Sequence, residues 1–146
     1  MTTYLNTDIP LPGLAGRRVL VVDDSPSLCK LMVNILEASG FAVVAADNGD
    51  TAMREMRAQT FDLLITDVVM PGTMNGCELV REARNLNPSM AVILTTGNVG
   101  DDAIFEMFEA GDPPPLLRKP FRMRELLESV RDAFAEQTAS LEPSQP

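Results

Sequence analysis

Acidic, basic and hydroxyl side chains stand at the ends of short apolar runs in this sequence. The residues at these ends are Asp23, Asp24, Asp67, Thr96 and Lys119. The chain contains no His, which removes imidazole acid–base chemistry and most transition-metal sites. The chemistry that remains is that of carboxylate, ammonium and hydroxyl groups.

Three carboxylates brought together would repel one another, at about 4 kcal/mol per pair for a separation of about 4 Å and an effective dielectric constant of about 20. Such a cluster is tolerable only with a cation. Oxygen ligands, in a chain without His or clustered Cys, favour Mg²⁺ over zinc. A metal with open coordination positions, a lysine ammonium and a hydroxyl donor together suit a phosphoryl group, whose oxygens they neutralise while a carboxylate attacks in line.

Five apolar strand-like runs alternate with five helical patterns and would carry these side chains to one place. The runs cover residues 18–22, 41–45, 61–66, 91–95 and 116–118. The helical patterns start near Pro26, Asp50, Asn75, Asp101 and Arg122 and end near Gly40, Gln59, Leu86, Gly111 and Glu136. This alternation predicts an α/β fold, a parallel sheet with helices on both faces. Ligands of such sheets bind beyond the carboxyl ends of the strands, where the site residues would converge.

Each of these side chains also has a purely structural interpretation. An Asp after a strand is commonly a turn former or a helix cap, and Asp23 and Asp24 before Ser25-Pro26 suit a helix start. A single Lys is commonly a solvated surface residue. The joint pattern favours a phosphate or Mg²⁺ site, because four strand ends independently carry the chemistry that such a site needs.

Composition and charge restrict the class of protein. The chain has 146 residues, 45% of them hydrophobic, and no apolar run of membrane-spanning length, so we expect one soluble domain without membrane contact. A net charge of −9 argues against nucleic-acid binding. We expect a cytoplasmic location, because no secretory signal is recognisable and Cys29 and Cys77 fall in apolar helical patterns as buried free thiols. Residues 1–16 are expected to be a flexible extension, 17–136 the domain and 137–146 a disordered tail.

Four motifs occur in order along the chain. They are Val21-Val22-Asp23-Asp24-Ser25, Leu64-Ile65-Thr66-Asp67-Val68-Val69-Met70-Pro71, Ile93-Leu94-Thr95-Thr96-Gly97 and Leu117-Arg118-Lys119-Pro120-Phe121. Over roughly Arg17 to Glu136 the chain closely resembles the receiver domain of two-component response regulators. The resemblance implies a doubly wound, flavodoxin-like fold like that of chemotaxis regulators, with strand order 2-1-3-4-5 and five helices.

The resemblance also implies a role for each site residue. Asp67 would accept a phosphoryl group from a sensor histidine kinase or a histidine phosphotransfer protein. Mg²⁺ would be held by Asp24 and Asp67, by Asp23 partly through water, and by the backbone carbonyl of Val69. Lys119 would pair with the acyl phosphate.

Two further features follow from the same resemblance. The bond between Lys119 and Pro120 would be cis, as family members usually have it. Of the adjacent threonines Thr95 and Thr96, we expect Thr96 to supply the switch hydroxyl, because its position before a glycine fits the family better.

The sequence departs from the family pattern near the expected fifth strand. Leu116 stands where the family has its switch aromatic, so the output change is expected to be smaller or carried by the fourth-helix loop. Residues 112–115 (Asp-Pro-Pro-Pro) should stiffen the entry to the strand. On the expected fourth helix, Met107 lies nearest to solvent. It is either a scattered apolar surface residue or part of a docking patch for a partner.

We interpret the chain as a stand-alone receiver, since no output domain fits after Glu136. We expect it to be a monomer or weak dimer. It would signal to an unknown downstream protein by contact or onward phosphotransfer. It would not be an enzyme beyond assisting its own phosphorylation and dephosphorylation, with moderate autodephosphorylation because Val69 is apolar. The alternatives are a phosphorylation-independent interaction module, a receiver piece of a hybrid histidine kinase, and a Mg²⁺-dependent phosphatase. The phosphatase would need an acid where Val69 stands.

Overall fold

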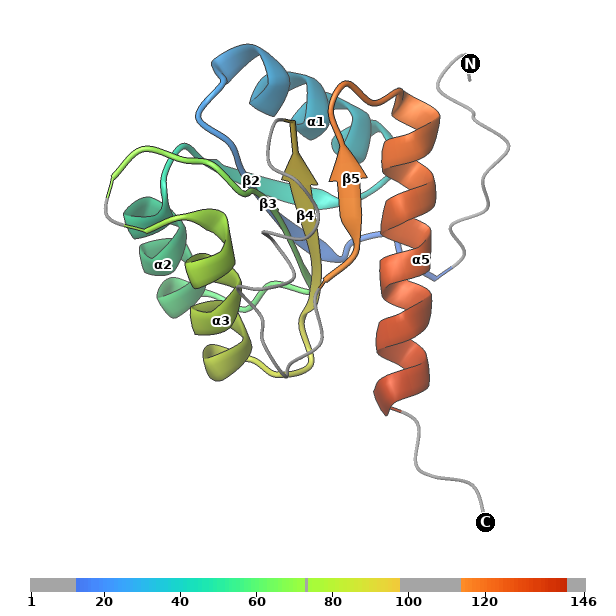
Figure 1. Cartoon of the computed structure of the whole chain (residues 1–146). Coiled ribbons are helices and arrows are strands. Elements are labelled where there is room, and N and C mark those ends of the chain that lie inside the picture. Colours follow the sequence, from blue (N-terminus) through green and yellow to red (C-terminus); the bar gives the residue numbers. More distant parts are fainter. Residues whose placement is uncertain (1–12, 73, 98–113, 142–146) are drawn as a thin grey trace.

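The computed structural model describes residues 13–72, 74–97 and 114–141, with side chains up to residue 137 (Figure 1). The strands are β1 (Arg18–Val22), β2 (Ala42–Ala46), β3 (Leu63–Asp67), β4 (Ala91–Thr96) and β5 (Leu116–Arg118). The helices in the described residues are α1 (Pro26–Ala38), α2 (Gly49–Ala58), α3 (Gly76–Leu86) and α5 (Met123–Leu141). The expected helix from Asp101 to Gly111, which includes Met107, lies outside the described residues.

The strands of the described residues form one parallel sheet in the order β2-β1-β3-β4-β5. Helices α1 and α5 cover one face, and α2 and α3 cover the other (Figure 1). The doubly wound α/β fold, its strand order and four of its helices are therefore confirmed. The strand order reverses between β1 and β3, so the crevice for a ligand is expected at the carboxyl ends of these two strands.

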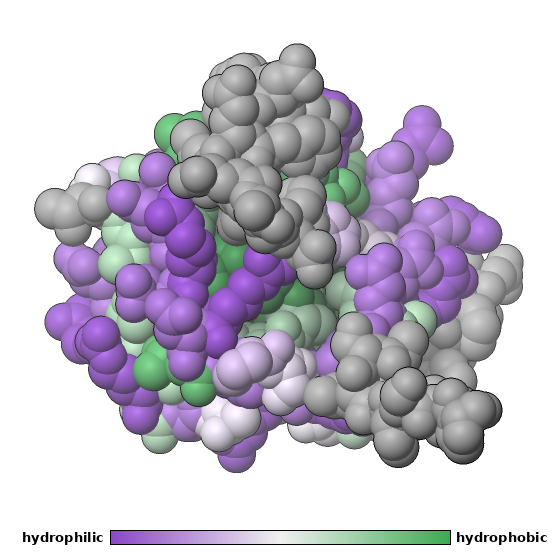
Figure 2. Space-filling model, turned by 60° about the horizontal axis from the view of Figure 1, so that its bottom comes forward, coloured by the Kyte–Doolittle hydropathy of each residue, from purple (hydrophilic) through white to green (hydrophobic). Residues whose placement is uncertain are grey.

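The central strands β1, β3 and β4 are buried on both faces, which is why they are apolar along most of their length. Alternate side chains point to opposite faces. The α2–α3 side receives Leu20, Leu64 and Leu94, and the α1–α5 side receives Val21, Ile65 and Ile93. Figure 2 turns the bottom of the molecule forward and shows mostly hydrophilic side chains, with hydrophobic ones visible between them. The apolar side chains are thus concentrated between the layers, and the polar ones of these strands collect at the strand ends.

Helix α1 begins and ends as the sequence predicts. Ser25 is its N-cap, with Oγ accepting the N–H of Leu28 at 3.3 Å, and Pro26 is its first residue. The helix gives way to Gly40, whose φ of 102° favours glycine. Asp23 directly follows β1, and Ser25 stands two residues after Asp23. The position of Ser25 at the helix start therefore helps to orient the Asp23 side chain.

Two boundaries differ from the prediction. Helix α5 continues to Leu141, so residues 137–141, expected in a disordered tail, are helical. The stretch from Met123 to Leu141 contains neither Pro nor Gly, and its Ala, Glu and Gln residues favour helix. At the other end, Leu14 packs against the α1–α5 core and the N–H of Gly16 donates to the Gly40 carbonyl at 2.7 Å. Packing with the domain therefore begins before Arg17.

Cys29 and Cys77 are buried and free, as predicted. Burial is the largest cause that raises the pKa of both thiols. Raised pKa values keep thiols protonated and unreactive at neutral pH. Within the described ranges, no helix has the length and apolar character needed to span a membrane.

Candidate functional site

The carboxyl ends of the central strands bring the predicted acids to one edge of the sheet. Val22 of β1 pairs with Thr66 of β3, so the residues that follow them, Asp23 and Asp67, come level there. Lys119 directly follows β5 and reaches the same place, although it is 96 positions from Asp23 in the sequence. The convergence expected from parallel strand topology is thus observed for these three side chains.

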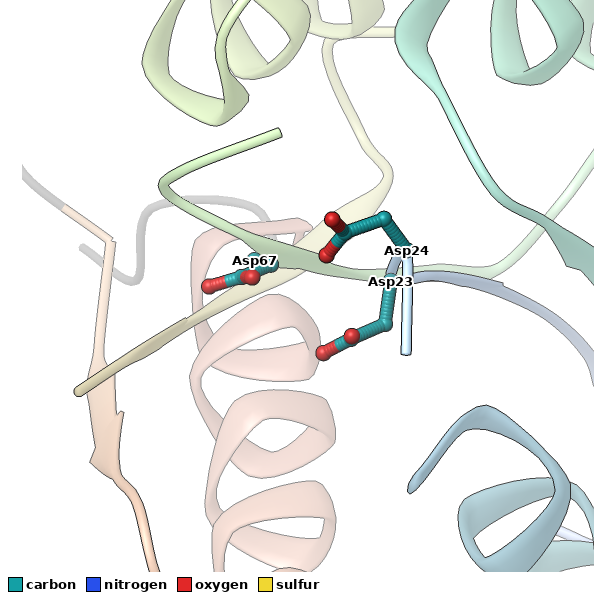
Figure 3. Close-up of side chains that lie close together, drawn as sticks. All are labelled: Asp23, Asp24 and Asp67. Carbon is teal, nitrogen blue, oxygen red and sulfur yellow. The ribbon is translucent and has the colours of Figure 1, made fainter. Parts of the chain in front are cut away.

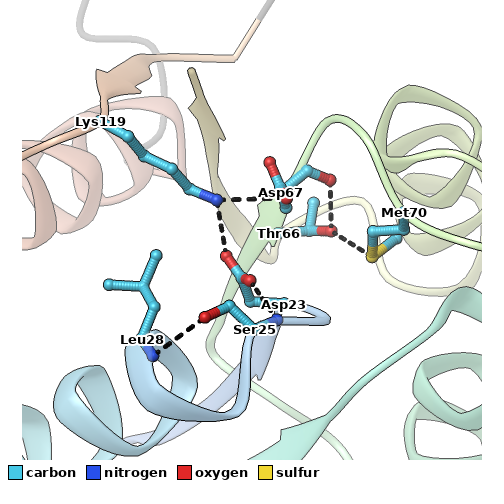
Figure 4. A network of polar contacts seen from close by, with 7 residues as sticks. All are labelled: Asp23, Ser25, Leu28, Thr66, Asp67, Met70 and Lys119. Carbon is cyan, nitrogen blue, oxygen red and sulfur yellow. Dashed lines mark hydrogen bonds and ion pairs between the residues drawn. The ribbon is translucent and has the colours of Figure 1, made fainter. Parts of the chain in front are cut away.

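One ammonium group contacts two carboxylates. Nζ of Lys119 lies 2.9 Å from Oδ2 of Asp23 and 3.2 Å from Oδ2 of Asp67 (Figure 4). The other oxygen of Asp23, Oδ1, accepts the N–H of Ser25 at 2.8 Å. The N-cap of α1 therefore also fixes the Asp23 carboxylate, and Lys119 joins that fixed group to Asp67.

Asp23, Asp24 and Asp67 each offer a carboxylate oxygen, and these oxygens lie within 4.8 Å of one another. Asp23 and Asp67 are buried, at 1% and 7% exposure, whereas Asp24 is exposed. Figure 3 shows Asp23 and Asp24 projecting from the end of β1 toward the side on which Asp67 lies. Three ionised carboxylates with one ammonium leave a formal charge of −2 in a small volume. This all-oxygen set is compatible with a hard divalent cation such as Mg²⁺.

The pKa values of Asp67 and Lys119 shift in the same direction. Burial is the largest cause and raises the pKa of Asp67, and the negative charge of Asp23 raises it further. The charge and hydrogen bond of Lys119 and the N–H of Val69 lower it. The net direction is upward. For Lys119, burial lowers the pKa, but the hydrogen bonds and charges of Asp23 and Asp67 outweigh burial and raise it. The ionised Asp67 is therefore poorly solvated, which leaves it in need of further positive charge.

The main chain of Asp67 is held from two sides. Oγ1 of Thr66 donates to the Asp67 carbonyl oxygen at 3.1 Å and lies 3.8 Å from Sδ of Met70 (Figure 4). A Cβ at Gly76, the first residue of α3, would lie 1.9 Å from the same carbonyl oxygen. The N–H of Gly76 donates to the Val68 carbonyl at 2.8 Å. Gly76 thus lets α3 begin directly against the backbone of Asp67.

Sequence reasoning gave no role to Thr66 or Gly76. The signals that could have found them are weak: a hydroxyl within an otherwise apolar strand, and a glycine in the first turn of a helix, where better helix formers are preferred. Neither signal identifies the tertiary contact. Both contacts are made with the carbonyl of Asp67, which no local pattern reveals.

Three other predicted residues lie around this edge. Thr96 ends β4 at 1% exposure, and its carbonyl accepts the N–H of Lys119 at 2.8 Å. Leu116 is half-buried and packs against the α2–α3 side of the core. The bond between Lys119 and Pro120 is cis. The switch role of Thr96 and the effect of Leu116 on the output stay predictions.

Solvent reaches the acids from the side of α1 and β2. A cleft of about 530 Å³ opens there, and its lining includes Asp23 and Asp24 together with the apolar Pro26, Val33 and Ala45. Val69, two residues after Asp67, is 60% exposed. Solvent therefore reaches this edge at the exposed Asp24 and Val69, while Asp23 and Asp67 themselves are buried.

The chain is similar to known proteins over most of its length. Residues 19–131 match the family model of the response regulator receiver domain. Response regulator receiver protein CpdR of Brucella abortus (strain 2308) is 32% identical over 114 residues, which cover 78% of this chain and 93% of CpdR. Transcriptional regulatory protein ZraR of Klebsiella oxytoca is 32% identical over 125 residues, which cover 86% of this chain but 28% of ZraR.

A solved structure agrees with both sequence comparisons. That of the chemotaxis response regulator CheY4 of Vibrio cholerae superimposes with a TM-score of 0.73 at 26% identity, covering 82% of this chain and 99% of CheY4. The chain therefore spans nearly the full length of some relatives and less than a third of others. The chain is thus similar to response regulator receivers in both fold and sequence.

Proposed function

The chain belongs to the response regulator receiver domain family of two-component systems, and on this premise we propose that Asp67 accepts a phosphoryl group from a phosphohistidine. The donor would be a sensor histidine kinase or a histidine phosphotransfer protein. The observation that carries the proposal is the contact of Lys119 with both Asp67 and Asp23 at the edge where Asp24 also lies. An acceptor carboxylate must be oriented and partly neutralised, and the contacts of Lys119 favour both.

In the proposed transfer, a carboxylate oxygen of Asp67 attacks the phosphorus of the phosphohistidine in line with the P–N bond. The new O–P bond forms as the P–N bond breaks, and the imidazole nitrogen leaves with the electron pair of the broken bond. Lys119 stabilises the charge on the phosphoryl oxygens, because its ammonium already lies 3.2 Å from the Asp67 carboxylate. The product is an acyl phosphate, and its hydrolysis restores the carboxylate.

Asp23, Asp24 and Asp67, with the Val69 carbonyl, would hold Mg²⁺. When bound, Mg²⁺ supplies positive charge that offsets the acids and the phosphoryl oxygens. The fit rests on the three carboxylate oxygens within 4.8 Å and on their excess negative charge. Asp23 is fixed by the N–H of Ser25, whereas the exposed Asp24 is free to adjust to the ion.

Phosphorylation adds about −1.5 to −2 charges at Asp67. Thr96 and Lys119 would move to satisfy the new oxygens and so shift an existing equilibrium of the adjoining loops. Because Leu116 replaces the family's aromatic residue, this shift would be smaller than usual or pass through another loop. The buried free thiols suit a cytoplasmic setting.

The signal would leave through protein contacts or onward phosphotransfer, from a stand-alone receiver that is a monomer or weak dimer. The stand-alone arrangement is supported by the match to CpdR, which is itself named a receiver protein and of which the chain covers 93%. The chain would catalyse no reaction other than its own phosphorylation and dephosphorylation. A receiver within a longer protein, as the 28% coverage of ZraR illustrates, is the alternative.

Acetyl phosphate with Mg²⁺, followed by intact-mass measurement, tests the proposal. We expect a gain of one phosphoryl group that is stable to acid, labile to alkali, dependent on Mg²⁺ and absent in Asp67→Asn. An equal gain in Asp67→Asn would place the acceptor elsewhere. No gain with acetyl phosphate or with a phosphohistidine donor would favour an interaction module that signals without phosphorylation.

A further inference from the structure

Among the described residues, one buried side-chain polar atom has no hydrogen-bond partner, the hydroxyl oxygen of Thr95. Thr95 lies in β4 and is 0% exposed. An unpaired buried hydroxyl destabilises a fold, and Val has the same shape without it. Packing alone therefore does not account for a threonine at this position.

Thr95 is the direct cross-strand neighbour of Asp67. The two residues are Cα partners in the pairing of β3 with β4, and neighbouring strands lie about 4.8 Å apart. Counting by alternation from Ile65 and Ile93, both side chains belong to the α1–α5 face. On its other side Thr95 pairs with β5, the strand that Lys119 follows. The hydroxyl thus belongs to the strand between the acceptor and the lysine that contacts it.

The acidic side chains near Thr95 at this edge of the sheet, Asp67 and Asp23, already have partners. Asp67 contacts Lys119 at 3.2 Å, and Asp23 contacts Lys119 and the N–H of Ser25. Thr96 belongs by alternation to the opposite face, with Leu94. The Thr96 hydroxyl would therefore have to move toward the phosphoryl group from the opposite face of β4, whereas Thr95 already belongs to the face of Asp67.

We propose that the Thr95 hydroxyl is a second hydrogen-bond donor of the acceptor site, unpaired while Asp67 carries no phosphoryl group and paired once it does. The inference rests on the proposed function of Asp67. A phosphoryl group brings oxygens that accept strong hydrogen bonds to this edge of the sheet, and a buried donor beside them gains a charged partner. The hydroxyl can rotate about its own Cα–Cβ bond, so its orientation can follow the change at Asp67.

Equilibrium binding of beryllofluoride with Mg²⁺, a stand-in for the phosphoryl group on Asp67, tests this role. Thr95→Val keeps the side-chain shape and removes the donor, so we expect beryllofluoride to bind about tenfold more weakly than to wild type. Thr95→Ser keeps the donor and removes a methyl group, so we expect binding within about twofold of wild type. Without beryllofluoride, the urea midpoint of Thr95→Val should equal or exceed that of wild type, because an unpaired hydroxyl has been removed.

A hydroxyl with only a structural role gives a different pattern. Wild-type beryllofluoride affinity in Thr95→Val would overturn the proposal. So would a lowered urea midpoint of Thr95→Val without beryllofluoride, since it would show that the hydroxyl is already bonded in the resting state. Failure of wild type itself to bind beryllofluoride or to be phosphorylated would instead contradict the proposed function of Asp67, so the two failures are distinguishable.

Discussion

The junctions that lead from β2 into α2 and from β3 into α3 are built from similar residues but differ in what they do. Each has an aspartate at the strand end and an Asn-Gly pair at the helix start. Asp47, after β2, is exposed and accepts the side-chain N–H of Asn48 at 2.6 Å. Asp67, at the end of β3, is buried and contacts Lys119. The first aspartate is a local turn residue, and the second belongs to a tertiary site.

The two glycines differ in the same way. A Cβ at Gly49, the first residue of α2, would lie 3.0 Å from the Cβ of Met74, a contact that a shift of a few tenths of an ångström would relieve. A Cβ at Gly76 would meet the Asp67 backbone at 1.9 Å. The same Asn-Gly pair thus carries a replaceable glycine at one junction and a required one at the other. The difference is that α3 begins against the backbone at the end of β3, whereas the start of α2 faces a side chain from another loop.

The largest expected effect separates these two glycines. Gly76→Ala should lower the free energy of unfolding by about 3 kcal/mol or more and slow phosphorylation by acetyl phosphate, because α3 must move away from the carbonyl of Asp67. Gly49→Ala should change the free energy of unfolding by less than about 1 kcal/mol. The higher helix propensity of Ala stabilises α2 by about as much as the close contact with Met74 destabilises it. Urea unfolding and phosphorylation rates measure both. Equal effects at the two sites would remove the distinction between the junctions.

The two aspartates should respond differently to Mg²⁺. At about a hundred times its dissociation constant, an ion that binds only the folded state stabilises it by about 2.7 kcal/mol. We expect a stabilisation of this order in wild type and in Asp47→Asn, and little in Asp67→Asn. Without Mg²⁺, Asp67→Asn should be at least as stable as wild type at pH 7. Because the folded state raises the pKa of Asp67, its ionisation opposes folding as the pH rises through that pKa. Thermal unfolding with and without Mg²⁺ distinguishes these outcomes.

The helix caps should differ less. Asn48 accepts the N–H of Thr51 at 2.8 Å, whereas Asn75 and Glu78 form a reciprocal capping box at 2.8 and 2.9 Å. Asn48→Ala should cost about 1 kcal/mol of stability, and Asn75→Ala about 1–2 kcal/mol. Chemical denaturation of both variants checks the order. A larger loss for Asn48→Ala would mean that the β2–α2 junction is the more constrained one.

The smallest effect on stability is expected at Val69, in the β3–α3 junction. Val69 is 60% exposed, so Val69→Asn should change the free energy of unfolding by less than about 0.5 kcal/mol. An amide beside Asp67 could orient a water molecule, so we expect the phosphoryl group to be lost faster than from wild type. Intact-mass measurements over time follow the loss. An unchanged rate would show that the apolar Val69 does not limit autodephosphorylation.

The fold could be predicted because apolar, β-branched runs alternate with capped helical patterns, and parallel topology then determines where the strand ends meet. That reasoning placed Asp67, Asp23 and Lys119 at one edge. Asp47 also follows an apolar run, so a position at a strand end does not by itself distinguish Asp67; the recurrence of chemistry at several strand ends does. The helical extension to Leu141 was missed because terminal segments with Ser, Glu and Pro resemble disordered tails.

Contacts that depend on the approach of distant backbone could not be predicted at all. A Cβ at Gly76 would lie only 1.9 Å from the Asp67 carbonyl oxygen, because the chain returns to the end of β3 before α3 begins. The unpaired hydroxyl of Thr95 depends on its neighbours in β3 and β5, which belong to other parts of the chain. Such positions are visible only once the elements are packed.

The central claim is that Asp67, and not another acid at the same edge, carries the phosphoryl group. Phosphorylation with acetyl phosphate and Mg²⁺, reduction of the acyl phosphate with borohydride, and peptide mapping locate the acceptor, because reduction converts a phosphorylated aspartate to homoserine. We expect homoserine at position 67 alone. Homoserine at position 23 or 24, or none at position 67 in a phosphorylated sample, would contradict the assignment.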